Sequence, residues 1–97
     1  MEYKTEGCSL TVKDTITVRD QLRYSSEVAF TLDIADRIVA WWEGAKLVIE
    51  KWECEQIEDY KTFDMDKSTN PEHARLIAWA ATTVWSHMAQ LKEVPKK

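Results

Sequence analysis

Glycine and proline are both scarce in this 97-residue chain, which contains two of each. These residues supply most tight turns, so their scarcity indicates few turns and long regular elements. It disfavours a β-sandwich or barrel, in which a turn signal is needed about every 8–12 residues. Gly7 and Gly44 are also too far apart to form a phosphate-cradling loop or a dinucleotide-binding motif. We therefore expect no nucleotide or other cofactor.

The chain also lacks an excess of basic residues and a long apolar run. Thirteen Lys and Arg oppose seventeen Asp and Glu, which gives a formal net charge of −4. A negative protein gains little from contact with phosphates, so we expect no nucleic-acid partner. No apolar run reaches the ~20 residues of a membrane helix, and Met1 is followed by charged Glu2 and Lys4 rather than by a signal peptide. We expect one domain over residues 1–97, located in the cytoplasm and without contact with a membrane.

Side chains that carry chemistry are few and scattered. Cys8 and Cys54 could pair, although two cysteines without a secretory signal favour reduced thiols. His73 and His87 are too far apart on one predicted helix to share a metal without other ligands. Cys54 with a histidine could form a nucleophile pair in space, but a buried inert thiol is the commoner outcome. We expect no catalytic residues and no enzymatic activity.

One acidic run imitates the start of a calcium-binding loop. Asp64-Met65-Asp66-Lys67-Ser68 supplies the first oxygen ligands of such a loop. An EF-hand then requires glycine at its sixth position and a bidentate glutamate at its twelfth. Thr69 and Arg75 occupy these places. We therefore interpret the run as solvated acids and expect no metal site.

The spacing of apolar residues predicts a mainly α fold with about three helices, over residues 18–30, 33–52 and 70–92. Thr17 and Asp20 have the spacing of an N-terminal cap for the first helix. We place Leu22, Ser25, Ser26, Ala29 and Phe30 near its inner face.

The second helix is expected to start at Asp33 as its N-cap. Gly44 lies inside it, which indicates a close approach of another backbone or a slight bend. The end of this helix is open, because Leu47 to Trp52 could also be a short strand.

Flanking segments complete this prediction. A short β element is expected at the N-terminus, where Leu10 and Val12 alternate with polar residues. An acidic loop is expected over residues 53–69, attached to the helices by its apolar residues Ile57, Tyr60, Phe63 and Met65. Asn70-Pro71 combines a favourable N-cap with proline at the first helical position, so it marks the start of the last helix.

All five tryptophans lie on the second and third predicted helices. A domain of this size buries only about 60–65% of its unfolded surface, so some indole surface should stay accessible. Trp42 and Trp85 lie away from the centres of their apolar stripes and are the first candidates for a protein interface. The wider candidate set adds Trp41, Trp79 and Met88.

Several segments together resemble the tail assembly chaperones of long-tailed (siphovirus-type) bacteriophages. The resemblance rests on the layout of the chain and on three stretches: Thr15-Ile16-Thr17-Val18-Arg19-Asp20-Gln21-Leu22-Arg23-Tyr24, Lys51-Trp52-Glu53 and Leu91-Lys92-Glu93-Val94-Pro95-Lys96. It implies a small helical protein that multimerises, covers the apolar tape-measure protein and delivers it to tail-tube subunits. The family offers no catalytic residues to carry over.

The sequence thus supports two hypotheses about the function. The first is a non-enzymatic phage tail assembly chaperone or scaffold, which self-associates and binds the tape-measure and tail-tube proteins. The alternative is a small acidic inhibitor or interaction module, whose segment from Glu53 to Asp66 blocks a basic site on a partner protein.

Overall fold

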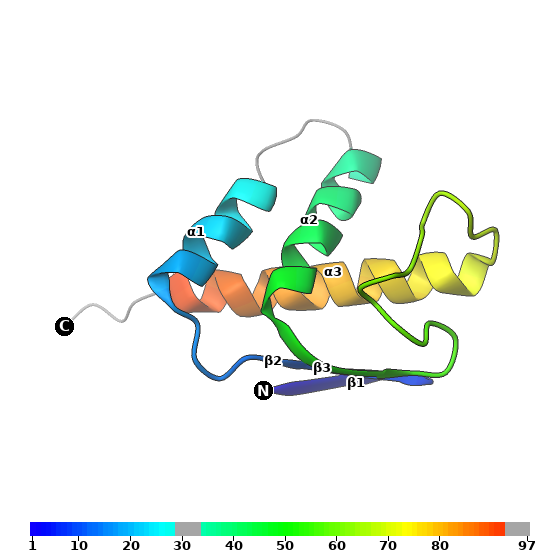
Figure 1. The fold of residues 1–97 in the computed structure, drawn as a ribbon, viewed down its shortest axis with the longest axis horizontal. Helices are drawn as coiled ribbons and strands as arrows, with labels where there is room; N and C mark the ends of the chain where they lie inside the picture. Colours follow the sequence, from blue (N-terminus) through cyan, green and yellow to red (C-terminus); the bar gives the residue numbers. More distant parts are fainter. Residues whose placement is uncertain (29–33, 93–97) are drawn as a thin grey trace.

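The computed structural model describes residues 1–28 and 34–92. Three helices and three strands follow one another along the chain (Figure 1). Their order is β1 (Glu2–Thr5), β2 (Cys8–Val12), α1 (Val18–Glu27), α2 (Ile34–Val48), β3 (Ile49–Cys54) and α3 (Pro71–Lys92). The fold is therefore α+β, and the expectation of a mainly α chain with one short β element is wrong.

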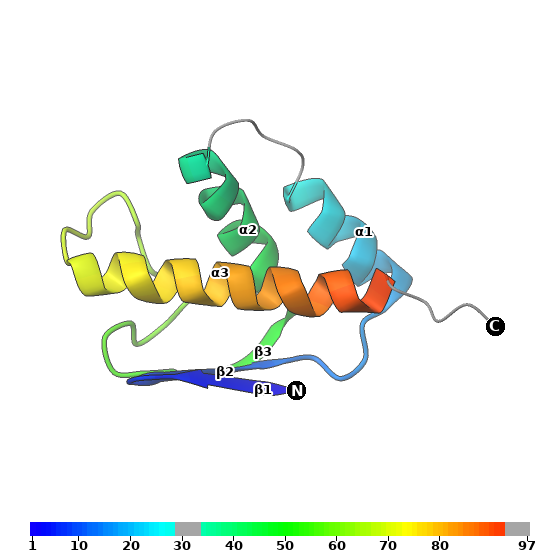
Figure 2. The same ribbon diagram turned by 180° about the vertical axis from the view of Figure 1, so that it is seen from behind.

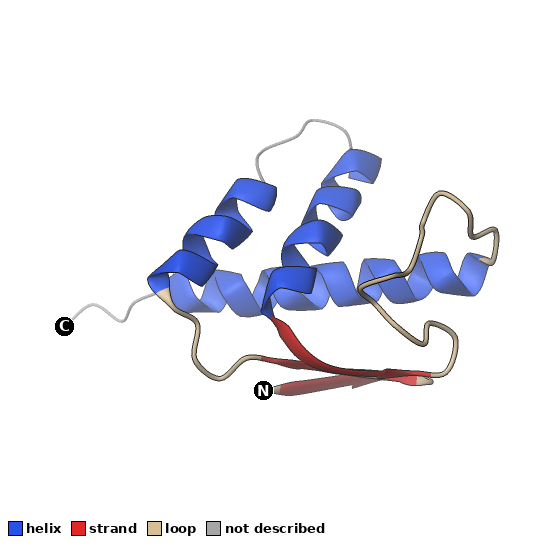
Figure 3. Ribbon diagram, in the orientation of Figure 1, coloured by secondary structure: helices blue, strands red, loops and turns tan. Residues whose placement is uncertain are grey.

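The three strands form one antiparallel sheet in the order β1-β2-β3. β1 and β2 form a hairpin whose turn contains Gly7 with a φ of 76°, a left-handed conformation that glycine adopts without steric cost. Figure 3 shows the sheet along one side of the molecule, next to α3. Leu10 and Val12 point from the central strand into the core, with exposed fractions of 1% and 0%.

The predicted second helix, 33–52, is too long, because its last part is strand β3. β3 pairs with β2 so that Leu10 lies opposite Trp52. The shift in register between Thr11 and Val12 leaves Glu50 without an opposite residue, which is a β-bulge. Pairing with the central strand thus overrides the helical period. The structure decides for the strand alternative from Ile49 onwards, while the expected N-cap Asp33 lies outside the described residues.

Helix α1 begins as predicted and buries a different face. Thr17 Oγ1 accepts from the backbone N–H of Asp20 at 3.1 Å, and the Asp20 carboxylate accepts from the N–H of Thr17 at 3.2 Å. Ser25, Ser26 and Leu22, expected inside, are exposed, whereas Tyr24 is 1% exposed. The helix is described as far as Glu27, and residues 29 and 30 of the predicted span lie beyond the described part.

α1 and α2 run in opposite directions and pack against each other, while α3 runs the length of the molecule across them, behind both in Figure 1 and in front of both in Figure 2. The start of α3 is confirmed, because the Asn70 side chain accepts from the backbone N–H of Glu72 at 2.9 Å. The loop between β3 and α3 has no helix or strand. It is attached as expected, with Ile57 and Tyr60 buried and Phe63 and Met65 packed against the core.

Candidate functional site

The most exposed indole lies where α2 crosses α3. Trp85 of α3 is 41% exposed, and its ring stacks on that of Trp41 of α2. The ring centroids are 4.7 Å apart and the planes are 16° from parallel. Such stacking stabilises the pair beyond the burial of its area and leaves the outer ring open to solvent. We call this pair the Trp41–Trp85 stack.

The helical period explains why the neighbouring residues Trp41 and Trp42 differ in burial. Successive residues of a helix point about 100° apart, so Trp41 and Trp42 leave α2 in different directions. Trp42 enters the core, where its ring meets that of Trp52 edge-on at 5.7 Å between centroids. On α3, Val84 is fully buried and the next residue, Trp85, lies at the edge of the buried face.

Two of the five predicted interface residues are core residues instead. Trp42 is 0% exposed and Met88 is 2% exposed, so neither can reach a partner while the domain is folded. Trp42 lies on the buried face of α2 together with Ala45 and Val48, three and six residues further on, which are also 0% exposed. Its indole N–H has no hydrogen-bond partner among the described residues.

Trp79 belongs to another surface. It is half-buried against the core and lies six residues before Trp85 on α3, which is about 240° around the helix axis. The structure thus brings Trp41 and Trp85 together and separates them from Trp79. Sequence reasoning missed the exposed apolar pair Val18 and Leu22 of α1, which are 71% and 67% exposed and one helical turn apart.

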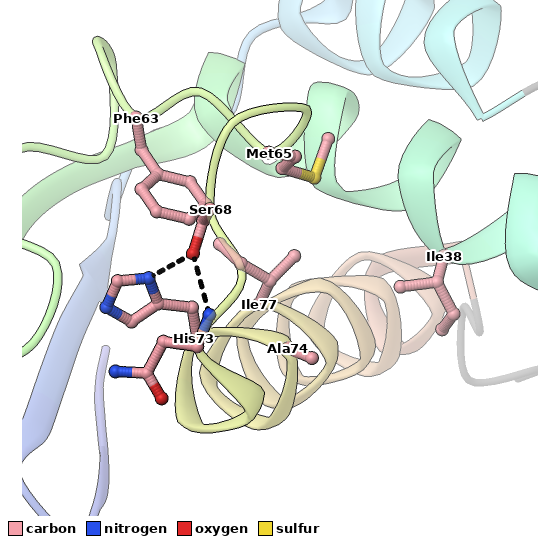
Figure 4. A pocket seen from close by; sticks show the side chains of 8 residues that line it. Ile38, Phe63, Met65, Ser68, His73, Ala74 and Ile77 are labelled. Atoms are coloured by element: carbon pink, nitrogen blue, oxygen red, sulfur yellow. Dashed lines mark hydrogen bonds between the residues drawn. The ribbon is translucent and has the colours of Figure 1, made fainter.

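A small pocket lies between α2, the acidic loop and the start of α3 (Figure 4). Its volume is about 220 Å³. This is below the roughly 300–1,000 Å³ of typical small-molecule sites, so the pocket suits a group the size of one side chain. Its walls are mostly apolar, with a polar end: Ile38, Phe63, Met65, Ala74 and Ile77, then Ser68, Asn70 and His73.

Ser68 and His73 form a hydrogen-bonded couple at the polar end of this pocket (Figure 4). Ser68 Oγ lies 2.6 Å from His73 Nδ1, and it accepts from the backbone N–H of Asn70 at 3.4 Å. The tautomer of His73 decides which of the two groups donates in this bond. The ring of Phe63 meets His73 edge-on. These contacts fix the end of the loop against the first turn of α3.

Hydrogen bonds within the acidic loop close it at Asp64. The Asp64 carboxylate accepts from the N–H of Asp66 at 2.9 Å, and its carbonyl accepts from the N–H groups of Lys67 and Ser68, both at 3.3 Å. The acids of the loop are exposed. Within residues 1–28 and 34–92, no cluster of three or more possible metal ligands occurs.

His87 lies near the N-terminus of the chain. Tyr3 Oη is 2.7 Å from His87 Nδ1, which ties β1 to α3. Burial lowers the pKa of His87, and the positive charge of the N-terminal amine lowers it further. A neutral ring therefore suits this position.

In comparisons with known proteins, no protein-family model, no curated protein and no solved structure matches the chain. Among the helices of the described part, none is long and apolar enough to cross a membrane.

Proposed function

We propose that this chain is a non-enzymatic assembly chaperone, which associates with copies of itself and with an apolar client protein through the Trp41–Trp85 stack. The observation that carries this proposal is the exposure of Trp85 beside a second indole. Tryptophan is among the residues that contribute most to binding energy at protein interfaces. A rigid aromatic pair also loses little conformational entropy when a partner covers it.

The pocket beside Ile38 offers a second contact for the same class of partner. It can receive one apolar side chain, while the stack covers a neighbouring turn of a client helix. The net charge of −4 keeps an assembly of several copies from aggregating. These features suit a client that exposes a long apolar helix.

The resemblance to phage tail assembly chaperones suggests the identity of the client. It is the tape-measure protein, held in the host cytoplasm until tail-tube subunits enclose it. The test is to express a tape-measure protein alone, with this chain and with the Trp85→Ala variant. We expect the client to stay in solution and to copurify only with the unaltered chain. Equal recovery in all three cultures would contradict the proposal.

A second candidate function rests on the charge of the acidic loop. Over residues 55–69, five exposed acids, Glu55, Glu58, Asp59, Asp64 and Asp66, oppose Lys61 and Lys67, which gives −3 (5 − 2). This surface suits a basic site on an enzyme or other partner. Binding of that kind falls steeply with added salt and with Glu58→Gln plus Asp66→Asn, whereas the Trp85→Ala variant keeps it. Binding that is indifferent to salt would exclude this function.

A further inference from the structure

Cys8 and Cys54 lie directly opposite each other on neighbouring antiparallel strands. The backbone N–H of Glu55 donates to the carbonyl of Gly7 at 2.9 Å, so residues 7 and 55 form a hydrogen-bonded pair. The next pair, Cys8 and Cys54, is then of the non-hydrogen-bonded kind, in which the Cα atoms are about 4.5 Å apart and the side chains are closest. This separation lies at the short end of the roughly 4.4–6.8 Å that a disulfide spans.

The two thiols also lie on the same face of the sheet. Strand alternation places Cys8 on the same side of β2 as Leu10, and Cys54 on the same side of β3 as Trp52. Both cysteines are free thiols. Burial raises the pKa of Cys8, and the contact with Cys54 raises it further.

Access to the pair is unequal. Cys8 is 5% exposed, whereas Cys54 is half-buried. Both line an open cleft at the end of the hairpin, whose charged lining residues are Lys4, Glu53 and Glu55. The more accessible Cys54 is thus placed to meet a reagent first, with Cys8 behind it.

We propose that Cys54 and Cys8 form a dithiol site that reduces small disulfides, with glutathione disulfide as the test reagent, and becomes a disulfide between β2 and β3. The Cys54 thiolate attacks one sulfur of glutathione disulfide, so that a Cys54–glutathione mixed disulfide forms and one glutathione leaves as its thiol. Cys8 then loses its proton and attacks Cys54 Sγ, which releases the second glutathione. In total, two protein thiols lose two electrons and two protons, and one glutathione disulfide becomes two glutathiones.

The new bond would hold the edge strand β3 to the centre of the sheet at the residue before the acidic loop. It would also close a long chain segment that contains α1 and α2. A cross-link over such a segment restricts the unfolded chain strongly, so the melting temperature should rise by more than about 5 °C.

The test treats the full chain with glutathione disulfide under native conditions and follows it by intact mass spectrometry and thiol counting. The unaltered protein should lose both thiols, lose the mass of two hydrogens and keep no glutathione. Cys8→Ala should keep one glutathione on Cys54. Cys54→Ala should stay unmodified while folded and react at Cys8 in denaturant. The reaction in denaturant also shows that Cys8 is an intact thiol, which the fold shields from the reagent.

Circular dichroism of both variants checks that they are folded. A stable glutathione adduct on the unaltered protein would overturn the proposal, because it would mean that Cys8 cannot resolve the mixed disulfide. Two unreacted thiols would overturn it as well, and so would a disulfide between two chains in place of the one within the sheet.

Discussion

A side chain at Gly44 would collide with Tyr24. A Cβ atom built on Gly44 of α2 lies 3.0 Å from Cε1 of the Tyr24 ring in α1, and 2.8 Å from Cγ1 of Val28. Real Cβ atoms essentially never show a contact as short as the one with Val28, and the contact with Tyr24 is tighter than nine in ten of theirs. The absence of a side chain at this position therefore permits the close packing of α1 on α2.

Gly44→Ala tests this packing. Alanine favours a helix over glycine by about 1 kcal/mol, whereas overpacking costs about 1–3 kcal/mol. We expect the free energy of unfolding, measured by urea titration, to fall by about 1 kcal/mol. The double variant Gly44→Ala plus Val28→Ala should lose less stability than the sum of the losses in the two single variants, because the smaller side chain at residue 28 makes room for the new Cβ. A Gly44→Ala variant more stable than the unaltered chain would show that the helices are not in close contact.

Tyr24→Phe tests the state of a buried hydroxyl. Tyr24 Oη has no hydrogen-bond partner in the described part of the chain. Removing it should leave stability near pH 7 unchanged or raise it by up to about 1 kcal/mol.

The same variant should change the alkaline stability. Burial raises the pKa of Tyr24. Above about pH 10 the unfolded chain releases this proton while the folded chain keeps it, so stability falls as the pH rises. Urea titrations at pH 8 and pH 11 should show a smaller loss for Tyr24→Phe, with the remainder due in part to Cys8. An identical loss in both proteins would contradict the burial of the phenol.

His87→Gln tests how stability depends on pH below neutrality. Because the pKa of His87 is lowered in the folded state, the unfolded chain binds a proton more readily as the pH falls through about 6.5. Stability should therefore fall between pH 7.5 and pH 5.5, and it should fall less in His87→Gln. Unfolding monitored by circular dichroism at the two pH values measures the difference, and equal slopes would exclude this role of His87.

The parts of the fold that depend on neighbours in the sequence were predictable. Thr17 with Asp20 and Asn70 with Pro71 mark two helix starts, because a cap acts within one turn. The sequence left open whether the segment of strand β3 is helix or strand. It forms a strand because it pairs with β2, some 40 residues earlier, where Leu10 lies opposite Trp52. Long-range pairing leaves little trace in local periodicity.

The candidate site was predictable in part for the same reason. An excess of indole indicated an exposed aromatic surface, and Trp85 provides one. Which of Trp41 and Trp42 faces inwards depends on how α2 crosses α3, and that angle is set by tertiary packing. The inner face of α1 was misplaced because Tyr24 is buried only where Gly44 leaves room. Leu22 thereby stays outside.

The most direct test of the account is sedimentation velocity over a dilution series of the unaltered chain, Trp85→Ala and Leu22→Ala. Leu22→Ala is the matched control, because it removes an exposed apolar side chain from another surface. We predict that the unaltered chain and Leu22→Ala associate as their concentration rises, and that Trp85→Ala stays a monomer with unchanged helicity. A monomer at every concentration of the unaltered chain, or equal association of all three proteins, would contradict self-association through the Trp41–Trp85 stack.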